Sequence, residues 1–345
     1  MDRRTALKTS LVTLACSSLL SGQQRTLFHT GWVPTDIPKG VPASKYAARI
    51  IGAGSNKVVR LFKYWEIANE APFQPHFQKI GDCVSQATAL AVETLSAKQV
   101  LNLGDTWCGK VSTEAIYAGS RVEIGKGALG NQEGSTGVWA AEFLSKYGVL
   151  VRRKYKSVDL SKYDPDLATR WARPRAGVPD ILEPVARQHL VHKTVNIDGG
   201  WTQACDLVSL GMPVVICSGI GFDDTCDRDG FLSPGPEWWH SMLLWAIDTK
   251  SSRPGGCIAN SWGLNWLKQR QHKYGTPPGC FWADAKVINK MLGYGDSHAI
   301  GDLEGFRDLS SVLHPPGRGT GSRSVLSRQW GGTSRSSAYQ SGVCL

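Results

Sequence analysis

The sequence predicts an α+β fold in which a helical lobe precedes a lobe of antiparallel strands. Apolar residues recur at helical spacing in the first half of the chain, whereas short apolar β-type runs separated by polar loops follow in the second half. Helices and strands that are segregated along the chain are typical of α+β proteins. The chain has 345 residues, of which 41% are hydrophobic and 20% charged, so it can bury a core of its own.

The N-terminal segment has the features of an export signal. Residues 3–8 (RRTALK) precede a short apolar stretch and then small and polar residues, an order typical of signal peptides and similar to the bacterial twin-arginine type. We interpret residues 1–25 as such a signal and expect an exported protein, periplasmic or extracellular; a frayed amphipathic helix is the alternative. No apolar run approaches the roughly 18 residues of a membrane-spanning helix, so no transmembrane segment is predicted.

Residues 26–60 are predicted to be an irregular lead-in, because they contain Pro, Gly and mixed polar residues with little periodicity. The run IGAGSN at residues 51–56 is interpreted as a turn, since a dinucleotide-binding loop would have a third glycine where Lys57 stands. We identify no inhibitory prosegment in this lead-in.

Three helices are predicted in the helical lobe. The first covers residues 83–98, where apolar residues recur at helical spacing and Asp82 is a suitable N-cap. The other two cover residues 112–120 and 136–146, and Gly148 provides a C-cap signal after the second of these.

The β lobe contains one further helix and three β-type runs. The helix is predicted over residues 202–210, and the runs over residues 213–217, 241–248 and 256–260. The last two runs are joined by a polar loop, which predicts an antiparallel hairpin.

These elements define a domain over residues 61–300, with a helical lobe of about 61–160 and a β lobe of about 161–300. Residues 301–345 are rich in Gly, Ser and Arg. We expect a disordered tail there, because such a segment cannot bury enough apolar surface to offset its chain entropy.

The net charge of +10 does not point to a nucleic-acid partner. Nine basic and three acidic residues between Lys146 and Arg175 contribute +6, and four arginines after Pro315 contribute the rest. The excess charge therefore lies in a connecting stretch and in the tail, and no specific nucleic acid is predicted as a partner.

Cys83, His240 and Asn260 are the candidate catalytic residues. Cys83 lies at the predicted start of a helix, where the dipole and the free N–H groups favour a thiolate, although the charge of Asp82 opposes this effect. His240 heads a β-type run, and an imidazolium there could stabilise the thiolate. The hairpin returns Asn260 towards His240, so its amide oxygen could accept the imidazole N–H. The Gln78 amide and the Cys83 backbone N–H could stabilise a developing oxyanion.

Three segments around these residues together resemble the papain family of cysteine proteases. Residues 78–83 (QKIGDC) resemble its nucleophile motif, residues 240–248 (HSMLLWAID) its histidine strand, and residues 258–266 (IANSWGLNW) its Asn-Ser-Trp-Gly run. The resemblance covers about residues 64–282. It implies a papain-like fold with an active-site cleft between the two lobes. It also implies a peptidase that hydrolyses peptide bonds through a thioester acyl-enzyme.

The resemblance also implies roles for individual residues. Asn260 would orient His240, and Trp262 would shield their hydrogen bond from water. Gln78 would donate a hydrogen bond to the oxyanion. Residues 132–137 resemble the glycine loop that lines the substrate cleft in this family, which makes Gly134 and Gly137 candidate cleft residues. Trp239, beside His240, is grouped with Trp262 as a residue for substrate binding or shielding.

The chain departs from the family pattern at three positions. The family's glutamine lies one residue further from the cysteine, where Phe77 stands here; Val84 replaces a common aromatic residue; and Ile80 replaces a disulfide cysteine. Two alternatives therefore stay open. One is an acyl transferase or amidase that uses the same Cys–His–Asn set, and the other is a catalytically inactive papain-like binding protein.

No metal or organic cofactor is predicted, and the expected partner is a peptide or protein substrate bound by a monomer. The acidic residues at 223–229 lack the spacing of a calcium loop and are interpreted as an acidic turn. The nine cysteines are odd in number, and Cys83 is the thiol that must stay free. The sequence leaves open the pairing of Cys108, Cys205, Cys217, Cys226, Cys257 and Cys280.

Overall fold

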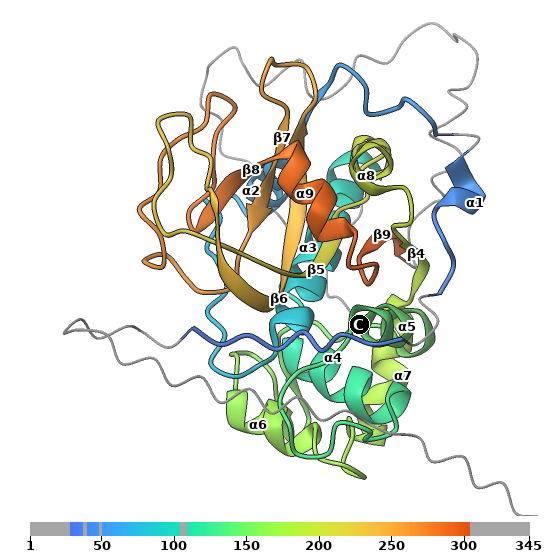
Figure 1. The fold of residues 1–345 in the computed structure, drawn as a ribbon. Coiled ribbons are helices and arrows are strands. Elements are labelled where there is room, and N and C mark those ends of the chain that lie inside the picture. Colours follow the sequence, from blue (N-terminus) through green and yellow to red (C-terminus); the bar gives the residue numbers. More distant parts are fainter. Residues whose placement is uncertain (1–27, 37–39, 48–49, 104–108, 304–345) are drawn as a thin grey trace, which may run out of the picture.

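The computed structural model describes residues 28–36, 40–47, 50–103 and 109–303, and these form two lobes (Figure 1). In the view of Figure 1 the helices α4, α6 and α7 lie below and most of the sheet lies above. The predicted signal peptide and nearly all of the predicted tail lie outside the described residues.

Most of the helices are short, and α3 is the one long helix among the described residues. The helices are α1 (Ser44–Ala47), α2 (Phe62–Ala68), α3 (Cys83–Leu103), α4 (Thr113–Gly119), α5 (Gly137–Tyr147), α6 (Pro165–Trp171), α7 (Glu183–Ala186), α8 (Gly200–Ser209) and α9 (Ala285–Leu292), with a π-helical turn at Ser120–Ile124 and 3₁₀ turns at Asp180–Leu182 and Arg187–His189. The four predicted helices are confirmed. The first continues five residues beyond its predicted end, whereas the others agree with prediction to within two residues.

The β lobe is built on one antiparallel sheet of seven strands. The strands are β1 (Val58–Arg60), β4 (Val191–Asn196), β5 (Val214–Phe222), β6 (Pro234–Asp248), β7 (Gly255–Ala259), β8 (Cys280–Asp284) and β9 (His298–Leu303); β2 (Lys154–Tyr155) and β3 (Val158–Asp159) form a separate hairpin. The order is β4-β9-β5-β6-β7-β8, with β1 paired to β6. Residues 213–217 and 241–248 prove to be the first half of β5 and the second half of β6.

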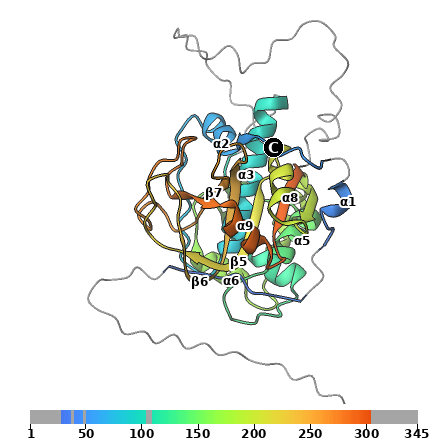
Figure 2. The same cartoon turned by 45° about the horizontal axis from the view of Figure 1, so that its top comes forward.

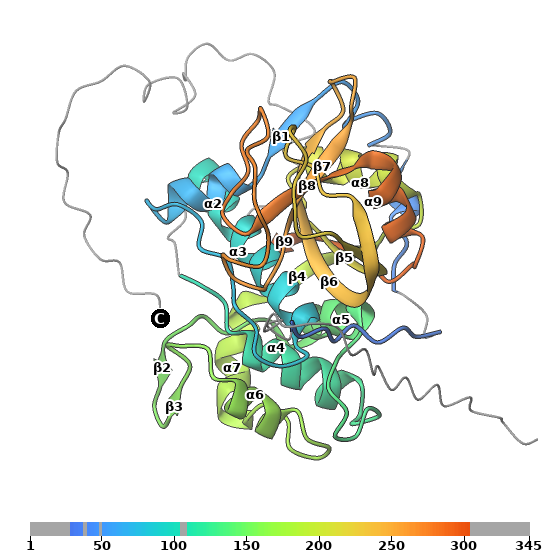
Figure 3. The same cartoon turned by 60° about the vertical axis from the view of Figure 1, so that its left-hand side comes forward.

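Helix α3 runs between the lobes and is buried on nearly every side. In Figure 2 it passes behind strands of the sheet, and in Figure 3 it lies beside the sheet between α2 and α4. It packs against β5, β6 and β9 as well as α4 and α5. Its carboxylate Glu93 is fully buried and accepts hydrogen bonds from Trp65 Nε1 at 3.0 Å and from the Val111 N–H at 2.9 Å. A helix covered all round explains why residues 83–95 are almost uniformly apolar or small.

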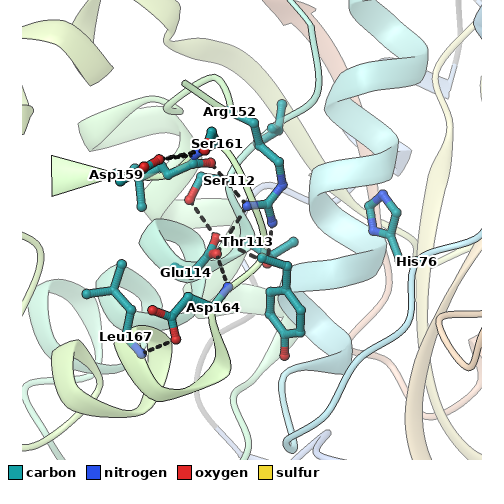
Figure 4. Close-up of polar contacts among 12 residues, drawn as sticks. His76, Ser112, Thr113, Glu114, Arg152, Asp159, Ser161, Asp164 and Leu167 are labelled. Carbon is teal, nitrogen blue, oxygen red and sulfur yellow. Dashed lines mark hydrogen bonds and ion pairs between the residues drawn. The ribbon is translucent and has the colours of Figure 1, made fainter. Parts of the chain in front are cut away.

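A buried ion pair joins α4 to the loop that precedes α6. The Glu114 carboxylate is fully buried and accepts hydrogen bonds from Arg152 Nη1 at 3.1 Å, the Asp164 N–H at 2.8 Å and the Ser112 hydroxyl at 2.8 Å (Figure 4). Asp164 in turn caps α6, which packs against α4. The helical lobe therefore continues past the predicted boundary near residue 160, to the 3₁₀ turn that ends at residue 189.

The lead-in is not irregular throughout, because it contributes to the fold in two ways. Val58–Arg60 forms strand β1 of the sheet, where Val58 pairs with Asp248. The residues 51–56 form a turn, as predicted, and the N–H groups of Gly52 and Gly54 donate to the Asp206 carboxylate. At the other end, β9 includes residues 301–303, so the sheet extends into the segment predicted to be tail.

Candidate active site

Cys83 is the first residue of α3, as the sequence predicts, and its side chain is fully buried. The backbone carbonyl of Asp82 accepts the N–H groups of Ser85 and Gln86, which starts the helix. The Asp82 carboxylate does not act as the predicted helix cap, because it bonds to side chains. It accepts hydrogen bonds from Gln86 Nε2 at 2.8 Å and from the Tyr163 hydroxyl at 2.9 Å.

The Cys83 thiol is neutral in this structure. Burial raises its pKa to about 12, and the negative charge of Asp82 raises it as well, although the N–H groups of Ser241, Gly31 and Val84 act in the opposite direction. The expected thiolate at a helix N-terminus is therefore absent here, because the desolvation of a fully buried sulfur outweighs the helix dipole.

His240 and Asn260 are brought together by the β6–β7 hairpin. His240 Nε2 lies 2.8 Å from Asn260 Oδ1, and both side chains are buried. The Ser261 N–H also donates to this oxygen at 2.7 Å. Because a backbone N–H donates to it, Oδ1 is an acceptor, and we assign the imidazole proton to Nε2. The lone pair of His240 then lies on Nδ1, which is buried and has no hydrogen-bond partner within the part of the chain that the structure describes.

The imidazole is neutral, like the thiol. Burial lowers the pKa of His240 to about 4, and the hydrogen bond to Asn260 opposes this effect. The next residue in β6, Ser241, presents its N–H to the Cys83 sulfur. The packing of α3 against β6 thus brings the candidate nucleophile from one lobe to the strand that carries the candidate base on the other.

Gln78 lies beside this pair despite its shifted position in the sequence. Its backbone N–H donates to the Ser261 carbonyl at 2.9 Å, and its Oε1 accepts a short hydrogen bond from the Ser261 hydroxyl. One N–H of its amide donates to the Ile80 carbonyl at 2.9 Å. The side chain is therefore held by Ser261, next to Asn260, with a second amide N–H left to donate.

The two predicted tryptophans lie at different places. The Trp262 ring covers His240, with centroids 4.6 Å apart and the planes 31° apart, and its side chain is buried. Trp239 contacts Trp32 and Tyr294 instead, with centroids 5.6 and 6.2 Å away. Trp262 thus packs on the imidazole, whereas Trp239 packs against Trp32.

The cleft between the lobes is occupied by residues 28–36 of the same chain. In Figure 1 this blue segment runs between the sheet and the helices α4 and α5. The N–H groups of Gly31 and Trp32 donate to the Trp239 carbonyl at 3.1 Å, and Ser135 bonds to the segment through both its N–H and its carbonyl. A Cβ on Gly31 would collide with the Gly81 carbonyl, two residues before Cys83. The lead-in therefore covers the candidate nucleophile, whereas the sequence predicted only an irregular segment there.

Gly134 contacts the segment 28–36 directly, whereas Gly137 contacts Asp296. Gly134 has φ +111°, and a Cβ there would approach the Gly31 carbonyl oxygen to 2.7 Å. Gly137 begins α5, and its N–H donates to Asp296 Oδ2 at 2.7 Å. The same oxygen accepts the indole N–H of Trp32 at 2.9 Å. Asp296 and Trp32 were missed in the sequence because no local pattern links residues so far apart along the chain.

The remaining cysteines and acidic residues form neither a disulfide nor a metal site in the described ranges. Besides Cys83, the five buried cysteines at 205, 217, 226, 257 and 280 form no disulfide in the described ranges; Cys108 lies outside the described residues. No cluster of three or more His, Cys, Asp or Glu side chains there could hold a metal ion. Part of the charge of the acidic turn is offset by Arg253, which lies 2.6 Å from Asp227 and 3.5 Å from Asp229. In the same ranges no helix is both long and apolar enough to cross a bilayer.

Comparisons with known proteins agree with this architecture at the level of the fold. No protein-family model matches the chain. No match was found among the curated proteins. Among solved structures the chain is similar to xylellain, a cysteine protease from Xylella fastidiosa, with a TM-score of 0.51, 16% identity, and coverage of 82% of this chain and 99% of that one. It is also similar to procathepsin B S9 from Trypanosoma congolense, with a TM-score of 0.50, 11% identity, and coverage of 80% and 87%. The chain has the papain-like fold of these cysteine proteases.

Proposed function

We propose that this chain is a cysteine peptidase that hydrolyses peptide bonds through Cys83, His240 and Asn260. The observation that carries the proposal is the bond between His240 Nε2 and Asn260 Oδ1 at 2.8 Å, beside the helix that begins with Cys83. This bond leaves Nδ1 of the imidazole as the atom that can take a proton from the thiol.

The chemistry then proceeds in two halves. His240 accepts the thiol proton, and the sulfur attacks the substrate carbonyl to form a tetrahedral oxyanion, for which the Cys83 N–H and the Gln78 amide are the candidate donors. The imidazolium protonates the leaving amine as the C–N bond breaks, which leaves a thioester on Cys83. A water molecule deprotonated by His240 then attacks the thioester, and the acid product leaves with the thiol restored.

Residues 28–36 have to move before a substrate can reach Cys83. In the covered state burial holds both the thiol and the imidazole in their neutral forms. Access of water to the cleft removes the largest cause of both shifts, so the pKa of Cys83 falls and that of His240 rises. Uncovering the cleft therefore favours the thiolate–imidazolium pair that attacks a carbonyl.

The substitution Gly31→Val tests this function in the full-length chain. The added side chain collides with the Gly81 carbonyl and displaces the segment, while every candidate catalytic residue is retained. We expect a peptidyl epoxide to label Gly31→Val at Cys83 much faster than wild type, and a fluorogenic peptide to be cleaved faster. Gly52→Ala is the control, because it strains a glycine of the same lead-in at φ +82° where the new Cβ meets nothing.

Two results would contradict the proposal. One is no labelling of a Gly31→Val protein that melts cooperatively, which would favour an inactive binding protein. The other is undiminished labelling of the double variant Gly31→Val/Cys83→Ala. Adding an amine acceptor separates hydrolysis from acyl transfer, since a transferase would give mainly the amide product.

A further inference from the structure

We propose that the pocket now filled by Trp32, a residue of the segment 28–36, selects a tryptophan side chain in the substrate. The selection of a substrate rests on the proposed function. The binding of a tryptophan side chain in this pocket rests on the contacts of Trp32 alone.

Residues 31–33 are bound as an extended strand, mainly through the backbone. Ser135 donates its N–H to the Gly31 carbonyl at 2.8 Å and accepts the Val33 N–H at 2.9 Å. On the opposite side, the Trp239 carbonyl accepts the N–H groups of Gly31 and Trp32. Backbone bonds of this kind hold an extended peptide without regard to its sequence, so selectivity has to come from the side chains that enter pockets.

Trp32 is the side chain that enters one. It is only 3% exposed, and its ring lies 5.6 Å from Trp239 and 5.7 Å from Tyr294, edge-on to the latter at 84°. Its indole N–H donates to Asp296 Oδ2 at 2.9 Å. By contrast Val33, the next residue, is only half-buried. Trp32 is therefore the anchor of this part of the segment, with two aromatic walls and one buried acceptor around it.

The acceptor is held by the protein and does not depend on Trp32. Asp296 is fully buried, and its two oxygens accept the Gly137 N–H at 2.7 Å and the Val138 N–H at 2.8 Å. Both donors belong to the first turn of the eleven-residue helix α5. The carboxylate thus stays oriented when Trp32 leaves, and it presents a lone pair that an N–H donor has to satisfy.

This combination favours indole over the other large side chains. Phenylalanine would fill the aromatic space but leave the acceptor unpaired, and leucine would forgo the ring contacts as well. Arginine also carries N–H donors. However, the N-terminal dipole of α5 already offsets part of the negative charge of Asp296, so the attraction between this carboxylate and a cationic side chain is weaker. A site built around one hydrogen bond rejects analogues that lack the donor by tenfold or more.

A binding experiment tests the pocket without requiring catalysis. The full-length double variant Gly31→Val/Cys83→Ala is titrated calorimetrically with the nonapeptide FHTGWVPTD, which is residues 28–36, and with peptides bearing Phe, Leu or Arg in place of Trp. We expect the Trp peptide to bind best, the Phe peptide about tenfold more weakly, and the Leu and Arg peptides more weakly still. A peptide with Ala in place of His29 is the matched control. It should bind like the parent, because His29 contributes its carbonyl to the Trp262 indole at 2.8 Å.

A cleavage experiment separates this inference from the proposed function. Gly31→Val is assayed with internally quenched peptides in which Trp, Phe, Leu or Arg stands directly before or directly after a glycine, because Gly31 lies at Cys83 and Trp32 is its neighbour. In at least one of the two orders the Trp peptide should give the highest kcat/KM. If the peptides bind in the proposed order but none is cleaved, the peptidase function is refuted and the pocket is supported. Cleavage and binding that ignore the aromatic side chain, or that favour Arg or Leu over Trp, would overturn the pocket and leave the peptidase standing.

Discussion

Replacing Asp82 with asparagine should stabilise the protein at neutral and alkaline pH. Asp82 is fully buried beside Cys83, and burial raises its pKa from 3.8 to about 7, against hydrogen bonds from Gln86 and Tyr163 that favour the charged form. The folded protein therefore keeps this proton over a pH range in which the unfolded chain has already released it. Asparagine is uncharged throughout and retains a carbonyl oxygen as the acceptor.

The sign and the size follow from this difference between the folded and unfolded states. A carboxyl group with a raised pKa stabilises the fold fully below its unfolded pKa of about 4, and this contribution is lost as the pH rises through about 7. The change from 3.8 to about 7 corresponds to about 4 kcal/mol in the free energy of unfolding. Asp82→Asn should therefore gain about that much relative to wild type between pH 4 and pH 8.

Urea unfolding of both proteins at pH 4.5 and pH 8 measures this gain directly. The comparison within each pH removes the opposite contribution of His240, whose lowered pKa makes stability rise with pH. Asp180→Asn is the control, because Asp180 is exposed and its substitution should change stability by less than about 0.5 kcal/mol. An Asp82→Asn difference that is the same at both pH values would refute the raised pKa of the buried Asp82.

Two further substitutions probe the site and the fold. In the Gly31→Val background, Asn260→Ala should lower kcat/KM about a hundredfold in a fluorogenic peptide assay, because His240 loses the oxygen that orients it; a change below threefold would argue against that role. Arg152→Met should destabilise the protein by about 3–5 kcal/mol in urea, because it leaves the buried Glu114 without its cation. The exposed control Lys146→Met removes a surface ion pair with side chains 60% and 39% exposed and should cost less than about 1 kcal/mol; equal losses would contradict the distinction.

One departure from the papain pattern, the position of Gln78, is smaller in the folded structure than it is in the sequence. Gln78 is one residue closer to Cys83 than the family pattern has it, yet Ser261 holds both its backbone and its side chain beside Asn260. Its placement is set by contact with the other lobe, and a short loop between Gln78 and α3 accommodates the missing residue.

The elements that the sequence predicted well are those with local causes. The periodicity of α3, the glycine after α5 and the hairpin that carries His240 and Asn260 depend on residues close to one another along the chain, and their backbone preferences act wherever the chain folds. The Asn-Ser-Trp-Gly run belongs to this group, because it places Asn260, Ser261 and Trp262 next to one another along the chain. For the same reason the two-lobed α+β fold could be read from the order of helices and strands.

Only the tertiary structure decided which segment fills the cleft and whether the Cys83 thiol is protonated. Gly31 meets the Trp239 carbonyl and Trp32 meets Asp296 across more than 200 residues of sequence, through backbone bonds and one indole that leave no periodic trace in the lead-in. The protonation of Cys83 was decided there too. The helix terminus favours a thiolate, but burial beneath residues 28–36 removes the water that would stabilise the charge, and desolvation outweighs the dipole. The sequence by itself determined which residues carry the candidate chemistry, and the packing of a distant segment determined that in this structure they are covered and neutral.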